Sequence, residues 1–189
     1  MAVPNASIAD LQRARRVLLH GVTGSGKSTA ARAIGRKLNL KVHLSDEEFG
    51  WLPNWTQRPA GEMRRLVGDV VVQPTWVFDT AYSAWRDLVE PRADVIVALD
   101  YPRWISLLRL IRRTFARVLD KEPICNGNVE TWEQVFSKDS IILWHFRSFK
   151  RKRATARAWA ERPEGTPVLL LRHPRDLDHV LAVLKTPTL

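Results

Sequence analysis

The amino-acid sequence predicts an α/β fold built around one parallel β-sheet, and two observations lead to this fold class. First, short apolar runs of the kind that form buried strands alternate with longer segments whose apolar residues recur at helical spacing. Such alternation is typical of a parallel sheet whose strands are joined by helices. Second, residues 21–28 fit the phosphate-binding pattern G-x-x-x-x-G-K-[ST], between an expected strand and an expected helix. At 189 residues, the chain is expected to form one domain over residues 1–189.

The glycine-rich segment 21–29 is the strongest functional signal in the sequence. It follows an expected strand at residues 17–20 and opens an expected helix at 29–38. Glycines let the backbone turn tightly and bring its N–H groups onto phosphate oxygens, and a helix N-terminus favours an anion. We therefore expect Lys27 to reach the β- and γ-phosphates of ATP and the Ser28 hydroxyl to ligate Mg²⁺. The other residues expected to bind the nucleotide are Gly21, Thr23, Gly24, Ser25, Gly26 and Thr29.

Composition narrows the class of protein. A hydrophobic content of 45% and a charged content of 26% are ordinary for a globular domain. The one cysteine, Cys125, rules out an internal disulfide framework and has no clear His partner for nucleophilic catalysis. No apolar run is long enough to span a membrane, and the N-terminus lacks the apolar core of a signal peptide. We expect a cytoplasmic protein without a membrane partner.

Positive charge is concentrated in one region. The formal net charge is +10, and residues 103–157 hold thirteen Lys and Arg against five Asp and Glu. Such an excess favours anionic partners, which include nucleotides, nucleic acid and acidic surfaces.

The N-terminal half is expected to place one acid at the ligand crevice. Residues 1–12 are predicted to form a loose leader, and Arg13, Arg15 and Arg16 to be solvated. A second strand is expected at 41–44, directly before Asp46. Because the carboxyl ends of parallel strands face the ligand, Asp46 is predicted to meet the substrate. The alternative is that Ser45 or Asp46 only caps the next short helix.

Residues 51–59 contain two tryptophans and two prolines, a composition that does not predict a regular element. Trp51 and Trp55 are expected either to anchor an irregular loop by their burial or to form an aromatic wall for a base or ring. The elements expected beyond this segment are a helix at 60–72, a strand at 75–79, a short helix at 84–90, a strand at 94–100, a helix at 102–117, a loop or small lid at 121–137, a long helix at 139–161, a strand at 166–171 and a last helix at 177–184.

Two acids and three arginines are further candidates for phosphate chemistry. Asp79 and Asp100 each close an apolar strand and compete for the role of the acid that helps to hold Mg²⁺, although a lone Asp at a strand end is often only a helix cap. Arg109, Arg112 and Arg113 are neighbours on one helix and suit the negative charge of phosphoryl transfer. The alternative is a solvated helix face. In the long helix at 139–161, the apolar positions are expected to be Ile142, Trp144, Phe146 and Phe149, and residues 150–157 are expected to be mainly solvated.

Several of these segments resemble a known family. Residues 21–29 resemble the phosphate loop of the adenylate-kinase-like nucleotide kinases. Asp46-x4-Trp51-x3-Trp55, the segment Trp-Val-Phe-Asp-x2-Tyr-Ser at 76–83, and residues 93–103 resemble the DNA topology modulation proteins, a group similar to adenylate kinase. This resemblance runs from about residue 16 to 113, and more weakly to 157. It implies a three-layer P-loop NTPase fold, with a five-stranded parallel sheet in the order 2-3-1-4-5, helices on both faces and a short basic lid.

The resemblance also implies roles for particular residues. The strand order places Asp79 beside the phosphate loop as the acid on the Mg²⁺ side. Arg109 and Arg113 resemble the paired arginines that open an adenylate kinase lid, and Arg172 lies where such kinases wrap the adenine. The chain departs from the family's Asp-Gly-Asn-Tyr at residues 79–82, and it lacks the Asp-Gly-Phe-Pro-Arg motif of true adenylate kinases, so AMP is not the expected acceptor.

We therefore predict an Mg·ATP-dependent phosphotransferase that acts on a nucleotide, a nucleoside or another small acceptor. The acceptor would bind at an insertion at about 46–74, under a lid at about 103–157. Asp46 would orient it and could act as a base toward a hydroxyl. The other candidate contacts to the acceptor are Trp51, Arg58 and Arg86. The alternative is a nucleotide-switched, nucleic-acid-associated regulator of DNA topology, which the basic excess favours, although no nucleic-acid-binding module is recognisable.

Overall fold

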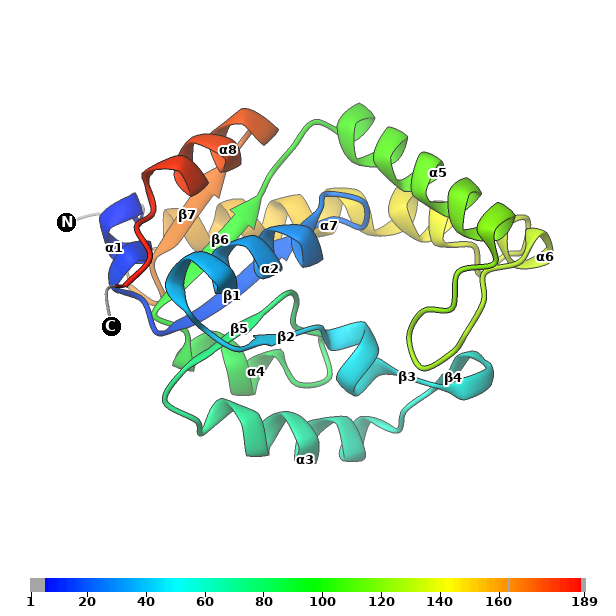
Figure 1. Ribbon diagram of the computed structural model, residues 1–189, viewed down its shortest axis with the longest axis horizontal. Coiled ribbons are helices and arrows are strands. Elements are labelled where there is room, and N and C mark those ends of the chain that lie inside the picture. Colours follow the sequence, from blue (N-terminus) through cyan, green and yellow to red (C-terminus); the bar gives the residue numbers. More distant parts are fainter. Residues whose placement is uncertain (1–5, 163, 188–189) are drawn as a thin grey trace.

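The computed structural model describes residues 6–162 and 164–187 and has three layers (Figure 1). The middle layer is a parallel five-stranded sheet in the order β2-β5-β1-β6-β7. Counted along the chain, this is the predicted order 2-3-1-4-5. The strands are β1 (Arg16–Gly21), β2 (Val42–His43), β5 (Trp76–Phe78), β6 (Val95–Leu99) and β7 (Val168–Leu171).

Helices cover both faces of the sheet, as predicted. On one face lie α1 (Ile8–Arg13), α2 (Lys27–Leu38) and α8 (Pro174–Val183), and on the other lie α3 (Ala60–Val71), α4 (Arg86–Val89) and α7 (Ile141–Glu161). Successive strand residues point to opposite faces, so Val17 and Leu19 pack with α2 while Leu18 packs in the other core. Burial on both faces explains why the strands are almost continuously apolar.

The second core is rich in aromatic side chains. Trp76, Phe78 and Trp85 are fully buried there, and the ring of Phe78 lies within 6 Å of the rings of the other two. Such aromatic contacts add to the large apolar area that these side chains remove from water. This core supports the side of the sheet on which α4 and α7 meet β1.

The lid elements stand at one end of the molecule (Figure 1). They are α5 (Arg103–Asp120), α6 (Trp132–Val135) and the first turns of α7. The loop between α5 and α6 reaches back across the molecule, where Asn128 donates to the Leu52 carbonyl at 2.9 Å and its side-chain oxygen accepts from the Trp55 N–H at 2.6 Å. The lid is thereby tied to the segment that follows β2.

The structure corrects two predictions about irregular segments. Within the expected leader, Ser7 and Asp10 form a capping box that begins α1, and Leu11 is fully buried; residues 1–5 lie outside the described residues. Residues 51–57 form a small antiparallel hairpin instead of an irregular loop. It consists of β3 (Trp51–Leu52), the 3₁₀ turn η2 (Pro53–Trp55) and β4 (Thr56–Gln57).

Two charge and burial assignments are also corrected. Arg16 is not simply solvated, because its guanidinium donates to Asp94 at 2.8 Å. In α7, Trp144 and Phe146 are exposed, and the buried positions are His145, Ser148, Phe149, Ala156 and Trp159. In the part of the chain that the structure describes, no helix combines the length and the apolar character needed to cross a bilayer.

Substitution of two helical glycines by alanine is expected to change the stability of the protein in opposite directions. A Cβ on Gly35 in α2 would lie 2.3 Å from Val42 Cγ2, whereas a Cβ on Gly68 in α3 would meet nothing within 4 Å. We expect Gly35→Ala to lower the free energy of unfolding by about 1–3 kcal/mol through overpacking. We expect Gly68→Ala to raise it by about 0.5–1 kcal/mol, because alanine restricts the unfolded chain. Urea unfolding followed by tryptophan fluorescence measures both, and equal effects would contradict this packing of α2 on β2.

Candidate active site

The phosphate loop connects β1 to α2 at the carboxyl edge of the sheet. Gly24 and Gly26 have φ angles of +81° and +92°, in the left-handed region that favours glycine, and Gly26 is the N-cap of α2. A Cβ on Gly24 would lie 2.3 Å from the Ser106 carbonyl oxygen, so α5 packs directly on the loop. From the other side, His145 on α7 donates from Nδ1 to the Thr23 carbonyl at 3.0 Å. The loop is held between the two lid helices.

Lys27 is a cation with little local neutralisation. Its ammonium donates to the Val22 carbonyl oxygen at 2.9 Å. Burial lowers the pKa of Lys27 to about 7, and the charge of Lys152 lowers it further, against the opposing effects of Asp79 and Asp46. An anion bound here would stabilise the charged form of the lysine.

Asp79 lies next to the loop, as the strand order predicted. Its carboxylate accepts from the Ser28 hydroxyl at 2.6 Å and from the Ser45 N–H at 2.9 Å. Burial raises the pKa of Asp79, although both hydrogen bonds oppose the shift. A hydroxyl and a carboxylate at hydrogen-bonding distance are suitable oxygen ligands for Mg²⁺. Among residues 6–162 and 164–187, no group of three or more His, Cys, Asp or Glu could hold a metal. A magnesium ion here would take its remaining ligands from phosphate and water, as is usual for Mg²⁺ in nucleotide sites.

Asp100, the competing acid, is engaged elsewhere. Its carboxylate is buried and pairs with the guanidinium groups of Arg153 and Arg157 on α7. Arg172 lines a cavity next to these three residues, with an exposed side chain and with its backbone N–H donating to Asp176 at 2.8 Å. The structure therefore does not bring Asp100 or Arg172 to the Ser28–Asp79 pair.

Asp46 begins the turn that follows β2 and is held by Tyr82. The Tyr82 hydroxyl donates to the Asp46 carboxylate, and burial together with that carboxylate raises the pKa of Tyr82. Asp46 opens the π-helical turn η1 (Asp46–Gly50). Ser45 does not cap this turn, because its hydroxyl donates to the Thr80 carbonyl at 2.7 Å. The charge of Asp46 is close enough to affect the pKa of both Lys27 and Lys152.

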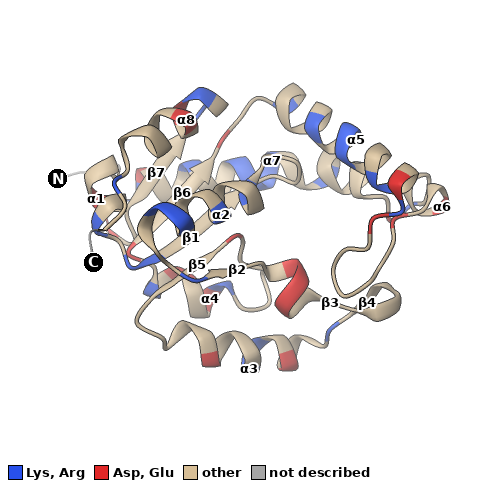
Figure 2. Cartoon of the chain, in the orientation of Figure 1, with Lys and Arg blue, Asp and Glu red and all other residues tan. Residues whose placement is uncertain are grey.

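Lys and Arg residues recur along α5 (Figure 2), and the predicted lid arginines of this helix have different surroundings. Arg109 donates to the Ser25 carbonyl at 3.4 Å, and its guanidinium lies 5.8 Å from the centre of the Tyr101 ring. Arg113 keeps access to solvent, but the surrounding protein lowers its pKa, and Asp46 and Glu130 are its acidic neighbours. Arg112 is exposed, as a solvated helix face requires.

The candidate acceptor residues are partly engaged in the fold. Arg58 donates to the Phe49 carbonyl at 3.1 Å and pairs with Glu62, which joins η1 to α3. The guanidinium carbon of Arg86 lies 5.6 Å from the centre of the Trp159 ring, and its Nε lies 3.9 Å from a carboxylate oxygen of Glu90. Trp51 packs edge-to-face on Trp55, with ring centres 5.6 Å apart, and both rings are half-buried.

Lys152 is a half-buried cation that the sequence analysis missed. It was expected to be solvated with its neighbours, as Lys150 is, but the surrounding protein lowers its pKa and Asp46 and Asp79 oppose that shift. The buried stripe of α7 runs through positions 145, 149, 152, 156 and 159 at helical spacing. This period could have indicated Lys152. Cys125 is a free thiol whose pKa burial raises to about 12, which does not suit a nucleophile.

Comparison with solved structures identifies proteins of the same fold. A shikimate kinase from Acinetobacter baumannii, in complex with shikimate, has a TM-score of 0.55 at 16% identity over 94% of this chain and 95% of that chain. A deoxyadenosine kinase from M. mycoides, with dCMP and dCDP bound, has a TM-score of 0.53 at 11% identity over 89% and 95%. A gluconokinase from Sinorhizobium meliloti 1021 has a TM-score of 0.50 at 14% identity over 88% and 87%.

These likenesses establish the fold and leave the acceptor open. No protein-family model matches the chain, and no curated protein sequence matches it. The chain shares its fold with P-loop kinases of nucleosides and small molecules, while the resemblance to the DNA topology modulation proteins stays a prediction.

The contacts of Asp100 predict a structural role. We expect Asp100→Asn to lower the free energy of unfolding by about 1–3 kcal/mol, because Arg153 and Arg157 lose a buried charged partner and solvent compensates only in part. Urea unfolding measures the loss. As a control, Asp69→Asn breaks the exposed 3.7 Å pair with Arg65 and should leave the midpoint unchanged. Unchanged stability of Asp100→Asn would mean that the three residues do not interact in solution.

Proposed function

We propose that this protein is an Mg·ATP-dependent kinase that transfers the γ-phosphoryl group to a small acceptor. The observation that carries the proposal is the 2.6 Å hydrogen bond between Ser28 and Asp79, beside a loop whose Lys27 has no ion pair with an acid among the described residues. This arrangement offers a cation, two oxygen ligands and a ring of backbone N–H groups to a bound triphosphate. The fold shared with three small-molecule kinases supports the same conclusion.

Each residue of the loop has a role in this proposal. Lys27 and the backbone N–H groups from Gly21 to Thr29 hold the phosphate oxygens. Ser28 and Asp79 hold Mg²⁺, directly or through water, and this ion supplies charge that offsets the phosphates. Arg109 borders the nucleotide site next to the Ser25 carbonyl. Arg172 stays a candidate contact for the adenine.

On the acceptor side, Asp46 faces the loop and Tyr82 holds its carboxylate. Asp46 orients the acceptor and accepts a proton when the acceptor is a hydroxyl. Arg113, whose acidic neighbours include Asp46, neutralises the transferring group. Trp51 in the insertion at 46–74 contributes an aromatic surface. The lid at 103–157 excludes water from the transfer.

The direction of the basic side chains favours a kinase over a nucleic-acid-associated regulator. A nucleic-acid surface needs cations that point outward along a path. Instead, Arg109 donates to the loop backbone, and Arg153 and Arg157 bind Asp100. These three cations are thereby engaged in contacts within the fold.

The direct test of the proposal is Lys27→Ala. Removing a charged donor to phosphate should weaken Mg·ATP binding by roughly ten- to a hundredfold and turnover by roughly a thousandfold. Calorimetry measures the binding, and phosphate transfer from labelled ATP across a panel of sugars, small acids, nucleosides and nucleotides measures turnover. The control is Lys37→Ala, which changes the same charge in the last turn of α2. Unchanged ATP affinity in Lys27→Ala would contradict the assignment of Lys27 as a phosphate-binding residue.

The two aspartates should differ in their effect on magnesium. Asp79→Asn keeps the size of the side chain but removes the charge, so the Mg²⁺ concentration for half-maximal activity should rise by roughly ten- to a hundredfold. Asp100→Asn should leave that concentration unchanged, because Asp100 binds Arg153 and Arg157. A magnesium titration of both variants, at a temperature where both are folded, decides the matter. The reverse ranking would remove Asp79 from the metal site.

A further inference from the structure

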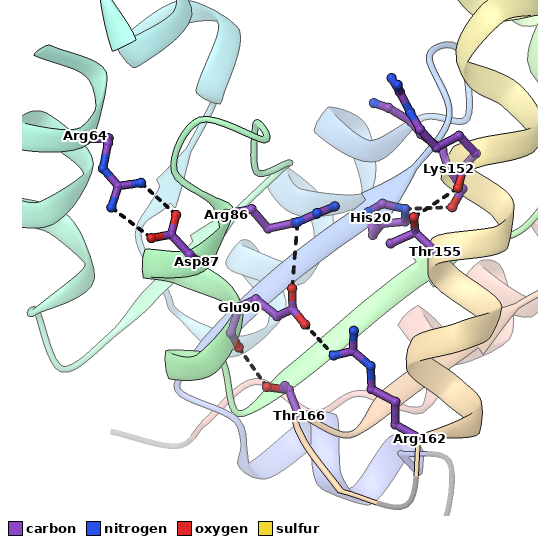
Figure 3. A network of polar contacts seen from close by, with 10 residues as sticks. His20, Arg64, Arg86, Asp87, Glu90, Lys152, Thr155, Arg162 and Thr166 are labelled. Carbon is purple, nitrogen blue, oxygen red and sulfur yellow. Dashed lines mark hydrogen bonds and ion pairs between the residues drawn. The ribbon is translucent and has the colours of Figure 1, made fainter. Parts of the chain in front are cut away.

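A second group of cations gathers at the carboxyl end of β1, on the face of the sheet opposite α2. It consists of Arg86 on α4 and Lys152 on α7, on either side of His20 (Figure 3). His20 hydrogen-bonds through Nε2 to the Lys152 carbonyl at 3.0 Å. The Trp159 ring packs on both His20 and Arg86. The centre of this ring lies 4.7 Å from the centre of the His20 ring and 5.6 Å from the guanidinium carbon of Arg86.

The charge of this group is not balanced by nearby acids. Of the described residues, no Asp or Glu lies within ion-pair distance of Lys152. Glu90 is 3.9 Å from Arg86 but binds Arg162 more closely, at 2.9 Å. Burial together with the charges of Lys152, Lys27 and Arg86 lowers the pKa of His20 to about 3, so the imidazole is neutral and adds no charge. Among the described residues, Lys152 therefore has no acid at ion-pair distance, and Arg86 has only a long pair with Glu90, an acid that it shares with Arg162.

The two acids that face Lys152 are committed to other partners. Asp79 accepts from Ser28 and Ser45, and Asp46 accepts from Tyr82. Both are near enough to influence the pKa of Lys152 without forming an ion pair with it. Because His20 directly precedes the phosphate loop, its hydrogen bond to the Lys152 carbonyl places this part of α7 beside the start of that loop.

The nucleotide does not account for these cations. The triphosphate would occupy the loop and the N-terminus of α2, where Lys27 serves it. Arg86 and Lys152 come from helices on the other face of the sheet, which belongs to the core of Trp85 and Trp159. An unpaired cation in a partly desolvated place is costly unless an anion completes it.

We propose that Lys152 and Arg86 form a receptor for an oxyanion of the acceptor, so that the acceptor is a small carboxylate or phosphate ester and not an uncharged sugar or nucleoside. This inference rests on the proposed kinase function. Lys152 is held in place through its own backbone by His20, and Arg86 is held by Trp159. Charge-assisted hydrogen bonds from such pre-positioned groups are stronger than neutral ones.

The first experiment measures binding alone. Inorganic sulfate is titrated into the protein, with and without Mg²⁺ and a non-hydrolysable ATP analogue, at constant ionic strength, and the melting temperature is recorded. Sulfate should stabilise the wild type, Lys150→Gln and Lys152→Arg more than it stabilises Lys152→Gln. Lys150 is the matched control, because it is exposed on the same helix and carries the same charge. General effects of sulfate on stability cancel between the two glutamine variants. Equal stabilisation of Lys150→Gln and Lys152→Gln overturns the receptor.

The second experiment compares matched acceptors. Gluconate is paired with sorbitol to test a carboxylate, and dCMP is paired with deoxycytidine to test a phosphate. The anionic member should have the higher kcat/KM, and Lys152→Gln should raise its KM by roughly ten- to a hundredfold with little change in kcat or in the KM for ATP. Arg86→Gln should act in the same direction. A preference for the uncharged member overturns the receptor.

The two proposals fail in different ways. Absence of nucleotide binding and of phosphate transfer to every acceptor, combined with sulfate binding that depends on Lys152, would remove the kinase and keep the anion receptor. Transfer to uncharged acceptors that is insensitive to Lys152→Gln would keep the kinase and remove the receptor.

Discussion

The carboxylate of Asp79 is the interaction on which the site depends. It accepts one hydrogen bond from Ser28 at the start of α2 and another from the Ser45 N–H after β2, and Asp79 itself directly follows β5. Three segments that are distant in the sequence are thereby fixed to one buried group. A buried carboxylate is tolerated only when its oxygens are satisfied, so the geometry around it has little freedom. This constraint fixes the phosphate loop relative to the turn that carries Asp46.

The lid helices belong to the site as much as to the surface. Gly24 leaves room for the Ser106 carbonyl of α5, and His145 of α7 holds the Thr23 carbonyl. A movement of either helix would therefore act on the loop that holds the phosphates. The same helix α7 also carries Lys152, whose backbone carbonyl bonds to His20 directly before the loop.

Several predictions of exposure or irregular structure were wrong where a residue distant in the sequence supplies an interaction partner. Arg16 was expected in solvent, but Asp94 at the start of β6 supplies its partner. Trp51 and Trp55 were expected in an irregular loop, but Asn128 from the lid donates to and accepts from the backbone of that segment, which is ordered as a hairpin. In α7, two aromatic residues face outward and a lysine faces inward, so hydrophobicity alone misassigned its buried side.

The sequence by itself determined the alternation of strands and helices, and it determined the phosphate loop, because both depend on residue types at short, fixed spacings. Its resemblance to known kinases supplied the strand order. Only the tertiary structure decided which aspartate meets Ser28, since Asp79 and Asp100 end similar strands and differ only in their neighbours. It alone decided that Lys152 is half-buried while Lys150 is exposed, because the burial of a helix face is set by what packs against it.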